Sequence, residues 1–295
     1  MTHPEARPAT TEAFRLGEGP VWDGARDRLL WVDIEAGAVL EGRLDGDQVR
    51  VTSRSEFGCL VGAVTVSADG RLLVAAQERL VVVDPDGTRH DGPRIVPPGE
   101  ERRMNDGKPD PAGNFLVGTL SLRPPSHREC LVRVEADWTV STIDDDLSLS
   151  NGLAWSADGA RMFSVDTRAR TIWARDYDAG TGAVGRRTPF SHVEPGFPDG
   201  LCMDAEGHLW VAVWGSGEVR RIAPDGSVVD RIPVPAPHTS SVAFAGDNLD
   251  LLVITTATSE LTEEQLARYP ASGRLFSVRL DVPGLPVHPW SGPPQ

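Results

Sequence analysis

The chain has 295 residues and a formal net charge of −14, with 40% hydrophobic and 24% charged residues. This composition is typical of a soluble globular protein with a sizeable core, whereas so acidic a surface repels phosphate backbones and argues against a nucleic-acid partner. No stretch approaches the roughly 18 consecutive apolar residues of a membrane helix, so the sequence predicts no membrane partner either.

The N-terminal residues MTHPEARPATTEA contain no apolar run, so we expect that they are not a signal peptide. The three cysteines, Cys59, Cys130 and Cys202, have no paired spacing, and we expect them to be buried reduced thiols in a cytoplasmic protein. We predict a flexible tail over residues 1–12 and a single domain over residues 13–295, present as a monomer or a weak oligomer.

From the tail onwards, one pattern occurs six times. Each copy has a turn with an acidic residue close to Gly or Asn, followed by a short strand-like run rich in Val, Leu and aromatic residues. In chain order the copies cover residues 22–33, 67–76, 110–119, 156–167, 204–213 and 246–256. Successive copies are 42 to 48 residues apart, measured between their strand valines, Val32, Val74, Val117, Val165, Val211 and Val253.

A period of roughly 40–50 residues with several short strands in each repeat is typical of a β-propeller. Further turn pairs, such as Asp86-Gly87 and Asp225-Gly226, fall between the six copies and indicate additional hairpins. We therefore predict an all-β fold, a six-bladed β-propeller with about four strands in each blade. The last predicted strand, residues 273–280, would share its blade with an early N-terminal strand.

Four polar residues do not belong to the repeat: Glu18, Asn105, Asn151 and Asp199. Each lies 12 or 14 residues before the valine of its copy, so they occupy similar positions in four different blades. Equivalent positions of a propeller converge on its central channel. Two carboxylates and two carboxamide oxygens at that point would suit Ca²⁺, Mg²⁺ or Mn²⁺ better than a soft metal.

Glycine follows three of these residues, as Gly19, Gly152 and Gly200, and would allow a sharp turn that aims the side chain inwards. The alternative is that Asn-Gly and Asp-Gly pairs here are ordinary turns that bind nothing. Spacing alone leaves both interpretations open.

Several longer segments resemble the gluconolactonase/regucalcin (senescence marker protein) family, in order and over almost the whole chain. They are GEGPVWD, RMNDGKPDPAGNFLVGT, SNGLAWSADG, PDGLCMDAEGHLWVA and SGRLFSVR. The resemblance implies a hydrolase of carbohydrate metabolism that converts sugar lactones to aldonic acids. It implies one divalent metal ion (calcium, zinc, manganese or magnesium) held by Glu18, Asn151 and Asp199. It also implies Arg103 and Asn105 as substrate-binding residues and Asp199 as the general base.

Two positions depart from the family pattern. Ser121 and Leu122 stand where animal members carry acidic residues, one of which contacts substrate, and Leu122 cannot hydrogen-bond to a sugar hydroxyl. The alternatives are therefore a lactonase or phosphotriesterase for another, more apolar ester, or a non-catalytic calcium-binding regulatory propeller. His238 is expected either at the channel mouth or on the outer surface.

Overall fold

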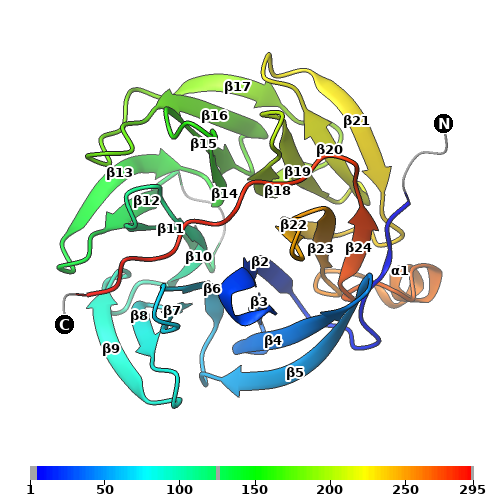
Figure 1. The fold of residues 1–295 in the computed structure, drawn as a ribbon, viewed down its shortest axis with the longest axis horizontal. Coiled ribbons are helices and arrows are strands. Elements are labelled where there is room, and N and C mark those ends of the chain that lie inside the picture. Colours follow the sequence, from blue (N-terminus) through cyan, green and yellow to red (C-terminus); the bar gives the residue numbers. More distant parts are fainter. Residues whose placement is uncertain (1–4, 124–126, 294–295) are drawn as a thin grey trace.

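The strands of the protein form six antiparallel sheets arranged as blades around a centre (Figure 1). The computed structural model describes residues 5–123 and 127–293, and in these residues each sheet has four strands. The prediction of a six-bladed β-propeller is confirmed. The first three blades are β2 (Gly17–Asp23), β3 (Arg28–Asp33), β4 (Ala38–Asp45) and β5 (Gln48–Glu56); β6 (Val61–Val66), β7 (Leu72–Ala76), β8 (Arg79–Val83) and β9 (Arg89–Arg94); and β10 (Arg102–Pro109), β11 (Phe115–Ser121), β12 (Glu129–Val134) and β13 (Val140–Leu147).

The remaining three blades continue in chain order around the ring. They are β14 (Ser150–Trp155), β15 (Arg161–Asp166), β16 (Thr171–Asp176) and β17 (Thr188–His192); β18 (Phe197–Met203), β19 (Leu209–Trp214), β20 (Glu218–Ile222) and β21 (Val228–Pro233); and β22 (Thr239–Ala245), β23 (Leu251–Thr256), β24 (Phe276–Arg279) and β1 (Arg7–Pro8). Two short helices interrupt the strands of the described chain, the 3₁₀ helix η1 (Gly24–Arg26) and α1 (Glu263–Arg268).

The sixth blade is built from both ends of the chain. Its outermost strand, β1, pairs with β24, so an N-terminal strand completes the blade as predicted. β1 lies within the segment that the sequence predicts as a tail, and Ala6 and Ala9 beside it are buried. This pairing joins the first blade to the last and leaves no break in the ring.

The hydrophobic core lies between neighbouring blades, and the second strand of each blade contributes most to it. The six repeat valines lie on β3, β7, β11, β15, β19 and β23 and are 0 to 1% exposed. Both faces of each sheet meet another blade, which explains why these strands are apolar at almost every position rather than at alternate ones. Each cysteine of the described chain is a free thiol, as predicted, but all three are only partly buried.

Each of the six innermost strands contains a β-bulge, at a similar height in the ring. The ladder register breaks in β2 after Glu18, in β6 after Val61, in β10 after Met104, in β14 after Asn151, in β18 after Pro198 and in β22 after Thr239. A bulge bends its strand and changes the direction of the side chains beside it. These bulges therefore determine which side chains reach the centre of the ring.

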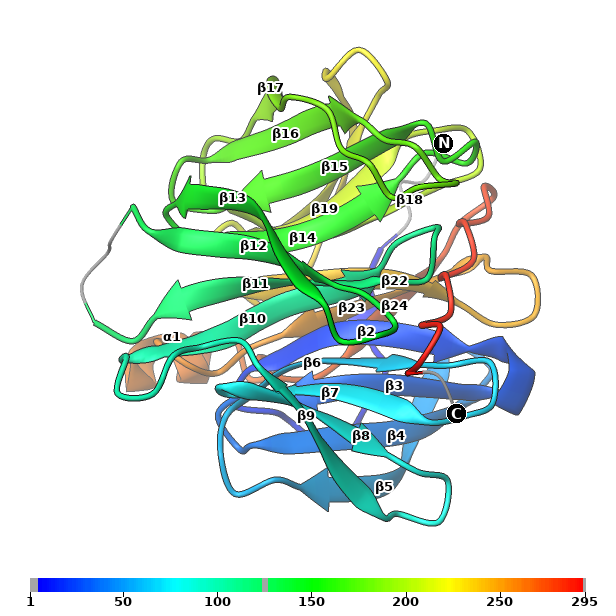
Figure 2. The ribbon, with the colours of Figure 1, turned by 90° about the vertical axis from the view of Figure 1, so that its left-hand side faces the viewer.

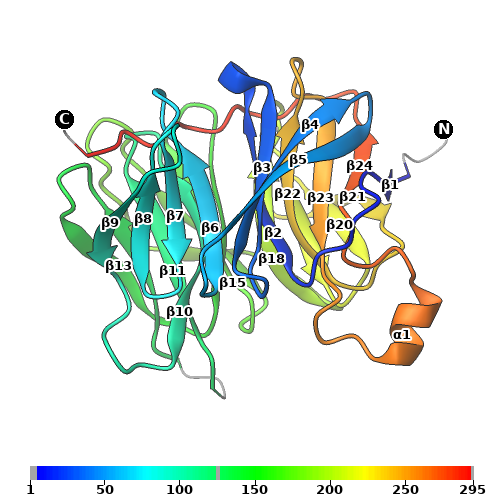
Figure 3. The same ribbon diagram turned by 90° about the horizontal axis from the view of Figure 1, so that it is seen from below.

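Residues 281–293 form a C-terminal strap that crosses the ring on the face away from α1 (Figures 1, 2 and 3). Its amides donate to carbonyls of several blades: Leu285 to Met203, Trp290 to Val66 and Ser291 to Gly113, at 2.9 to 3.0 Å. The strap thus connects the fifth, second and third blades across that face. No helix in the described part of the chain is long and apolar enough to cross a membrane.

Trp290 anchors the C-terminal strap. Its indole is 1% exposed and packs in the cluster that contains Phe115 and Val134, with the Trp138 ring 5.9 Å away. We expect Trp290→Ala to lower the free energy of unfolding by about 3–5 kcal/mol, because it leaves a cavity of the size of an indole. Val229→Ala is the control, since Val229 is 52% exposed and its truncation should change stability by less than about 0.5 kcal/mol. Chemical denaturation compares the two variants, and equal midpoints would contradict an anchoring role for Trp290.

Candidate active site

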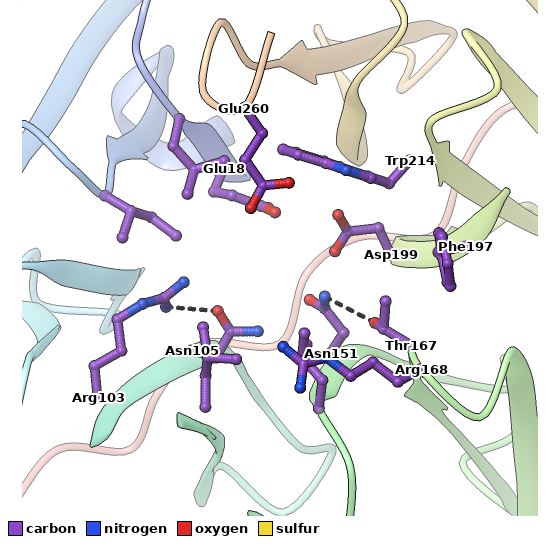
Figure 4. Close-up of a pocket in the computed structure, with 14 residues that line it drawn as sticks. Glu18, Arg103, Asn105, Asn151, Thr167, Arg168, Phe197, Asp199, Trp214 and Glu260 are labelled. Carbon is purple, nitrogen blue, oxygen red and sulfur yellow. Dashed lines mark hydrogen bonds between the residues drawn. The ribbon is translucent and has the colours of Figure 1, made fainter. Parts of the chain in front are cut away.

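The five predicted site residues line one pocket at the centre of the ring (Figure 4). The pocket has a volume of about 240 Å³, below the roughly 300–1,000 Å³ of pockets for drug-sized ligands. A pocket of this size suits a small substrate. Four inner strands supply the residues: β2 carries Glu18, β10 carries Arg103 and Asn105, β14 carries Asn151 and β18 carries Asp199.

The bulges explain the two different spacings seen in the sequence. Glu18 and Asn151 pair directly with the repeat valines Val32 and Val165, 14 residues further along. Asn105 and Asp199 instead lie inside the bulges of β10 and β18, two residues closer to their valines. The four side chains therefore reach the channel from slightly different backbone positions rather than from one strictly repeated position.

The glycines after the site residues have two different functions. Gly19 has φ +50°, the left-handed conformation expected of a glycine turn. For Gly152 and Gly200 the predicted turn is wrong, because neither has a positive φ. A Cβ on Gly152 would lie 2.5 Å from the Asp199 carbonyl oxygen, and one on Gly200 would lie 2.0 Å from the Ser241 hydroxyl. These two glycines instead allow neighbouring inner strands to approach closely.

Arg103 and Asn105 are joined by a short hydrogen bond. The Arg103 Nη1 donates to Asn105 Oδ1 at 2.6 Å and to the Met104 carbonyl at 3.0 Å, and Asn105 Nδ2 donates to the Ser150 carbonyl at 2.8 Å. Both ends of the Asn105 amide are thereby engaged, and its orientation is determined by its neighbours. Its oxygen already accepts a charged donor, so Asn105 is a poorer candidate for a metal ligand than Asn151.

Asn151 and Asp199 each present an oxygen without a hydrogen-bond partner among the described residues. Asn151 Nδ2 donates to Thr167 Oγ1 at 3.1 Å, which leaves Asn151 Oδ1 free. Asp199 Oδ1 is also buried and unsatisfied. Leaving such atoms unpaired in a protein interior costs free energy, so a missing partner is the natural explanation. A cation with a preference for oxygen ligands fits this pair together with the Glu18 carboxylate.

The described residues contain no cluster of three or more His, Cys, Asp or Glu side chains suited to a metal ion. A metal site here would therefore depend on the Asn151 carboxamide as well as on carboxylates. Such a mixed set of oxygens is typical of Ca²⁺ and Mg²⁺ sites rather than of structural zinc sites.

Buried carboxylates in the pocket resist ionisation. Burial raises the pKa of Glu18 to about 8, and the nearby Asp106 carboxylate acts in the same direction. Burial also raises the pKa of Asp199 well above its ordinary value, and both Glu18 and Asp106 add to this effect. Burial lowers the pKa of Arg103 to about 10, so its guanidinium remains charged at neutral pH. A positive ion between the carboxylates would relieve their mutual repulsion.

Asp106 is a buried carboxylate close to the pocket, although not among the residues that line it, and the sequence analysis missed it. It lies in the same bulge as Asn105 and is 7% exposed, with its pKa raised by burial. The Asp-Gly pair that it forms with Gly107 resembles a turn, and this pattern concealed it. Its position directly after Asn105 is the signal that could have identified it.

Residues outside the inner strands also complete the pocket, and the sequence analysis named none of them as site residues: Thr167 follows β15, Trp214 ends β19 and Glu260 lies in the loop before α1. Thr167 orients Asn151, and Trp214 and Glu260 line the wall. His238 is 8% exposed and stacks on Trp214, so it lies next to the pocket rather than on the outer surface. Leu122 is 47% exposed and is not among the described residues that line the pocket.

Comparison with known proteins shows the same architecture and similar sequences elsewhere. Residues 16–258 match the family model described as SMP-30/Gluconolactonase/LRE-like region. The chain is 38% identical to pentonolactonase XacC of Haloferax volcanii over 274 residues, 91% of each chain. It is 34% identical to a 6-deoxy-6-sulfogluconolactonase of Pseudomonas putida, over 91% of this chain and 92% of the other. The crystal structure of a calcium-binding protein, regucalcin, from Agrobacterium tumefaciens superposes with a TM-score of 0.91 at 27% identity, covering 97% of both chains.

The raised pKa of Glu18 predicts a pH-dependent stability in protein treated with EDTA. Between the ordinary value of 4.5 and about 8, the folded state keeps a proton that the unfolded chain has lost. The free energy of unfolding should therefore fall as the pH rises through this window. Glu18→Gln removes the titrating group, so the variant should decline less and exceed the wild-type stability near pH 9 by on the order of 5 kcal/mol. Guanidinium denaturation at a series of pH values measures this, and parallel profiles would contradict it.

Proposed function

Since the chain belongs to the SMP-30/gluconolactonase/LRE-like family, we propose that it is a metal-dependent hydrolase of sugar lactones. Relatives named as a pentonolactonase and a 6-deoxy-6-sulfogluconolactonase support the reaction class. The single observation that carries the proposal is the meeting of Glu18, Asn151 and Asp199 in one buried pocket, with unsatisfied oxygens beside the charged Arg103.

Glu18, Asn151 and Asp199 would hold the divalent cation. Calcium is the first candidate, because the superposable regucalcin is named as a calcium-binding protein, with zinc, manganese and magnesium as the others. When bound, such an ion polarises a carbonyl and lowers the pKa of water. Its charge would also favour the ionised form of Glu18 and Asp199, which burial alone disfavours.

Asp199 is the proposed general base. Lactone hydrolysis forms a bond between a water oxygen and the carbonyl carbon and breaks the ring bond between that carbon and the ring oxygen. The Asp199 carboxylate has two oxygens, and one of them would accept the proton of the attacking water while the other faces the cation. The ring oxygen takes up a proton as it leaves, and the product is a hydroxy acid.

Arg103 and Asn105 would orient the substrate. Arg103 uses Nη1 for Asn105 and Met104, and within the described chain its Nε and Nη2 have no hydrogen-bond partner. Those N–H groups can donate to hydroxyl or carbonyl oxygens of a bound lactone. Asn105 maintains the position of the guanidinium, because it is itself held by the Ser150 carbonyl.

The alternative of a more apolar ester depended on Leu122, which does not line the pocket in the described structure. A non-catalytic cation-binding propeller would use the same oxygen ligands, and only an assay separates it from a lactonase.

The protein is stripped with EDTA, then supplied in turn with Ca²⁺, Mg²⁺, Mn²⁺ or Zn²⁺, and acid release is followed with a panel of sugar lactones. Rates well above spontaneous hydrolysis that depend on the metal support the proposal. Cation binding without hydrolysis of any lactone would favour the non-catalytic alternative.

Asp199→Asn should lower the rate of lactone hydrolysis by at least about 100-fold, since it removes the proton acceptor. It should also weaken cation binding, measured by calorimetry, while the circular dichroism spectrum stays that of the wild-type protein. Asp225→Asn is the matched control, because Asp225 lies in an exposed turn, where its carboxylate accepts hydrogen bonds from Ser227, and it does not line the pocket in the described structure. Full activity of Asp199→Asn would remove Asp199 from the mechanism.

A further inference from the structure

Glu260 adopts a backbone conformation that is unusual for its residue type. Its φ is +63°, in the left-handed region that L-residues other than Gly, Asn and Asp rarely occupy. Six non-glycine residues in the described ranges have a positive φ, and of these Glu260 is the one that lines the central pocket. Residues held in such conformations cluster at functional sites.

The loop around Glu260 is held firmly in place. Glu260 lies between β23 and α1, where the amides of Thr258 and Ser259 both donate to the Arg15 carbonyl, at 3.0 and 2.9 Å. The Leu261 amide donates to the Thr258 carbonyl at 3.2 Å. Because these bonds lie on both sides of Glu260, the surrounding loop imposes its backbone conformation.

The same loop is joined to an aromatic wall of the pocket. His238 Nδ1 lies 3.0 Å from the Ser259 carbonyl oxygen. The His238 ring stacks on Trp214, with centroids 4.1 Å apart and an angle of 12° between the planes. One face of Trp214 is thus occupied by His238, and Trp214 also lines the pocket. The stack links the position of the aromatic wall to that of Glu260.

The Glu260 carboxylate is free to bind a ligand. In Figure 4 it reaches into the pocket from the side opposite Asn105 and Asn151. Within the described part of the chain its one recorded interaction is electrostatic, with His238, and the residue is exposed. An ionised carboxylate is a pure acceptor that can receive two hydroxyl groups at once. A flat ring beside it offers an apolar surface for the C–H groups of a sugar.

We propose that Glu260 is a specificity-determining residue that accepts hydrogen bonds from hydroxyl groups of a polyhydroxylated lactone, while Trp214 packs against the carbon skeleton. This inference rests on the proposed function and adds the residue that would distinguish lactones with several free hydroxyls from unsubstituted lactones. The carboxylate reaches the pocket from the sixth blade, from the loop that follows β23.

The test compares kcat and KM for glucono-δ-lactone and for δ-valerolactone, which has the reacting ester but no hydroxyl groups. Glu260→Gln should raise KM for gluconolactone about tenfold or more, as expected for the loss of a charge-assisted hydrogen bond. Its kcat should stay within about twofold, and both parameters for δ-valerolactone should be unchanged. Spontaneous hydrolysis is subtracted for both compounds.

Two further variants separate substrate contact from structure. Glu260→Gly relieves the strained φ, so it should show the same loss in KM for gluconolactone without any fall in melting temperature. Glu264→Gln is the control for charge, since Glu264 lies in the first turn of α1 and does not line the pocket in the described structure. It should behave as the wild-type protein with both lactones.

The outcomes distinguish the inference from the proposed function. Wild-type hydrolysis of gluconolactone with no change in KM for Glu260→Gln would overturn the inference alone. Equal losses with both lactones, or a weaker affinity for Ca²⁺, would also overturn it, because they would place Glu260 at the reacting centre or at the cation. If the wild-type protein hydrolyses no sugar lactone of the panel with any of the four cations, the proposed function fails and the inference fails with it.

Discussion

The close approach of the inner strands is the constraint on which the rest of the site depends. In a regular strand the side chains alternate between the two faces, and few of them would point along the channel. The bulges redirect side chains towards the centre, and Gly152 and Gly200 allow the strands to come together there. Side chains from four blades then share one small pocket. A methyl group at either glycine would push neighbouring inner strands apart and separate the side-chain oxygens that meet in the pocket.

Electrostatics follows from that packing. Three carboxylates, on Glu18, Asp106 and Asp199, are buried near one another, and the pKa of each is raised. Such an arrangement destabilises the fold at neutral pH unless positive charge is close by. Arg103 supplies part of this positive charge, and its position is determined by its hydrogen bond to Asn105. The rigid core between blades supports this unfavourable arrangement, because the repeat valines and the pairing of β1 with β24 hold the ring closed.

The two ends of the channel have different structures. On one face the C-terminal strap crosses the ring and bonds to several blades (Figure 3). On the other, Thr167 and Glu260 in loops and Trp214 at the end of β19 line the pocket. The inner strands thus supply the groups with strongly perturbed pKa values. The residues at this end of the channel would contact the parts of a ligand that lie away from those groups. Changes in the loops can alter which ligand fits without moving the strands that carry the carboxylates.

The repeat period and its apolar strands determined the six-bladed fold, because each blade is a local unit whose hydrophobic pattern is visible in the sequence. Departures from the repeat identified Glu18, Asn105, Asn151 and Asp199, and the structure brings them together. Only the tertiary structure decided how they meet. Asp106 resembled a turn residue, and the need for Gly152 and Gly200 arises from contacts with neighbouring blades. Glu260 belongs to a loop without a repeating pattern, whereas Trp214 ends β19, directly after the fifth copy of the repeat, and the two residues are far apart in the sequence. Ring closure brings such residues to one pocket, and no local pattern encodes which of them will face each other.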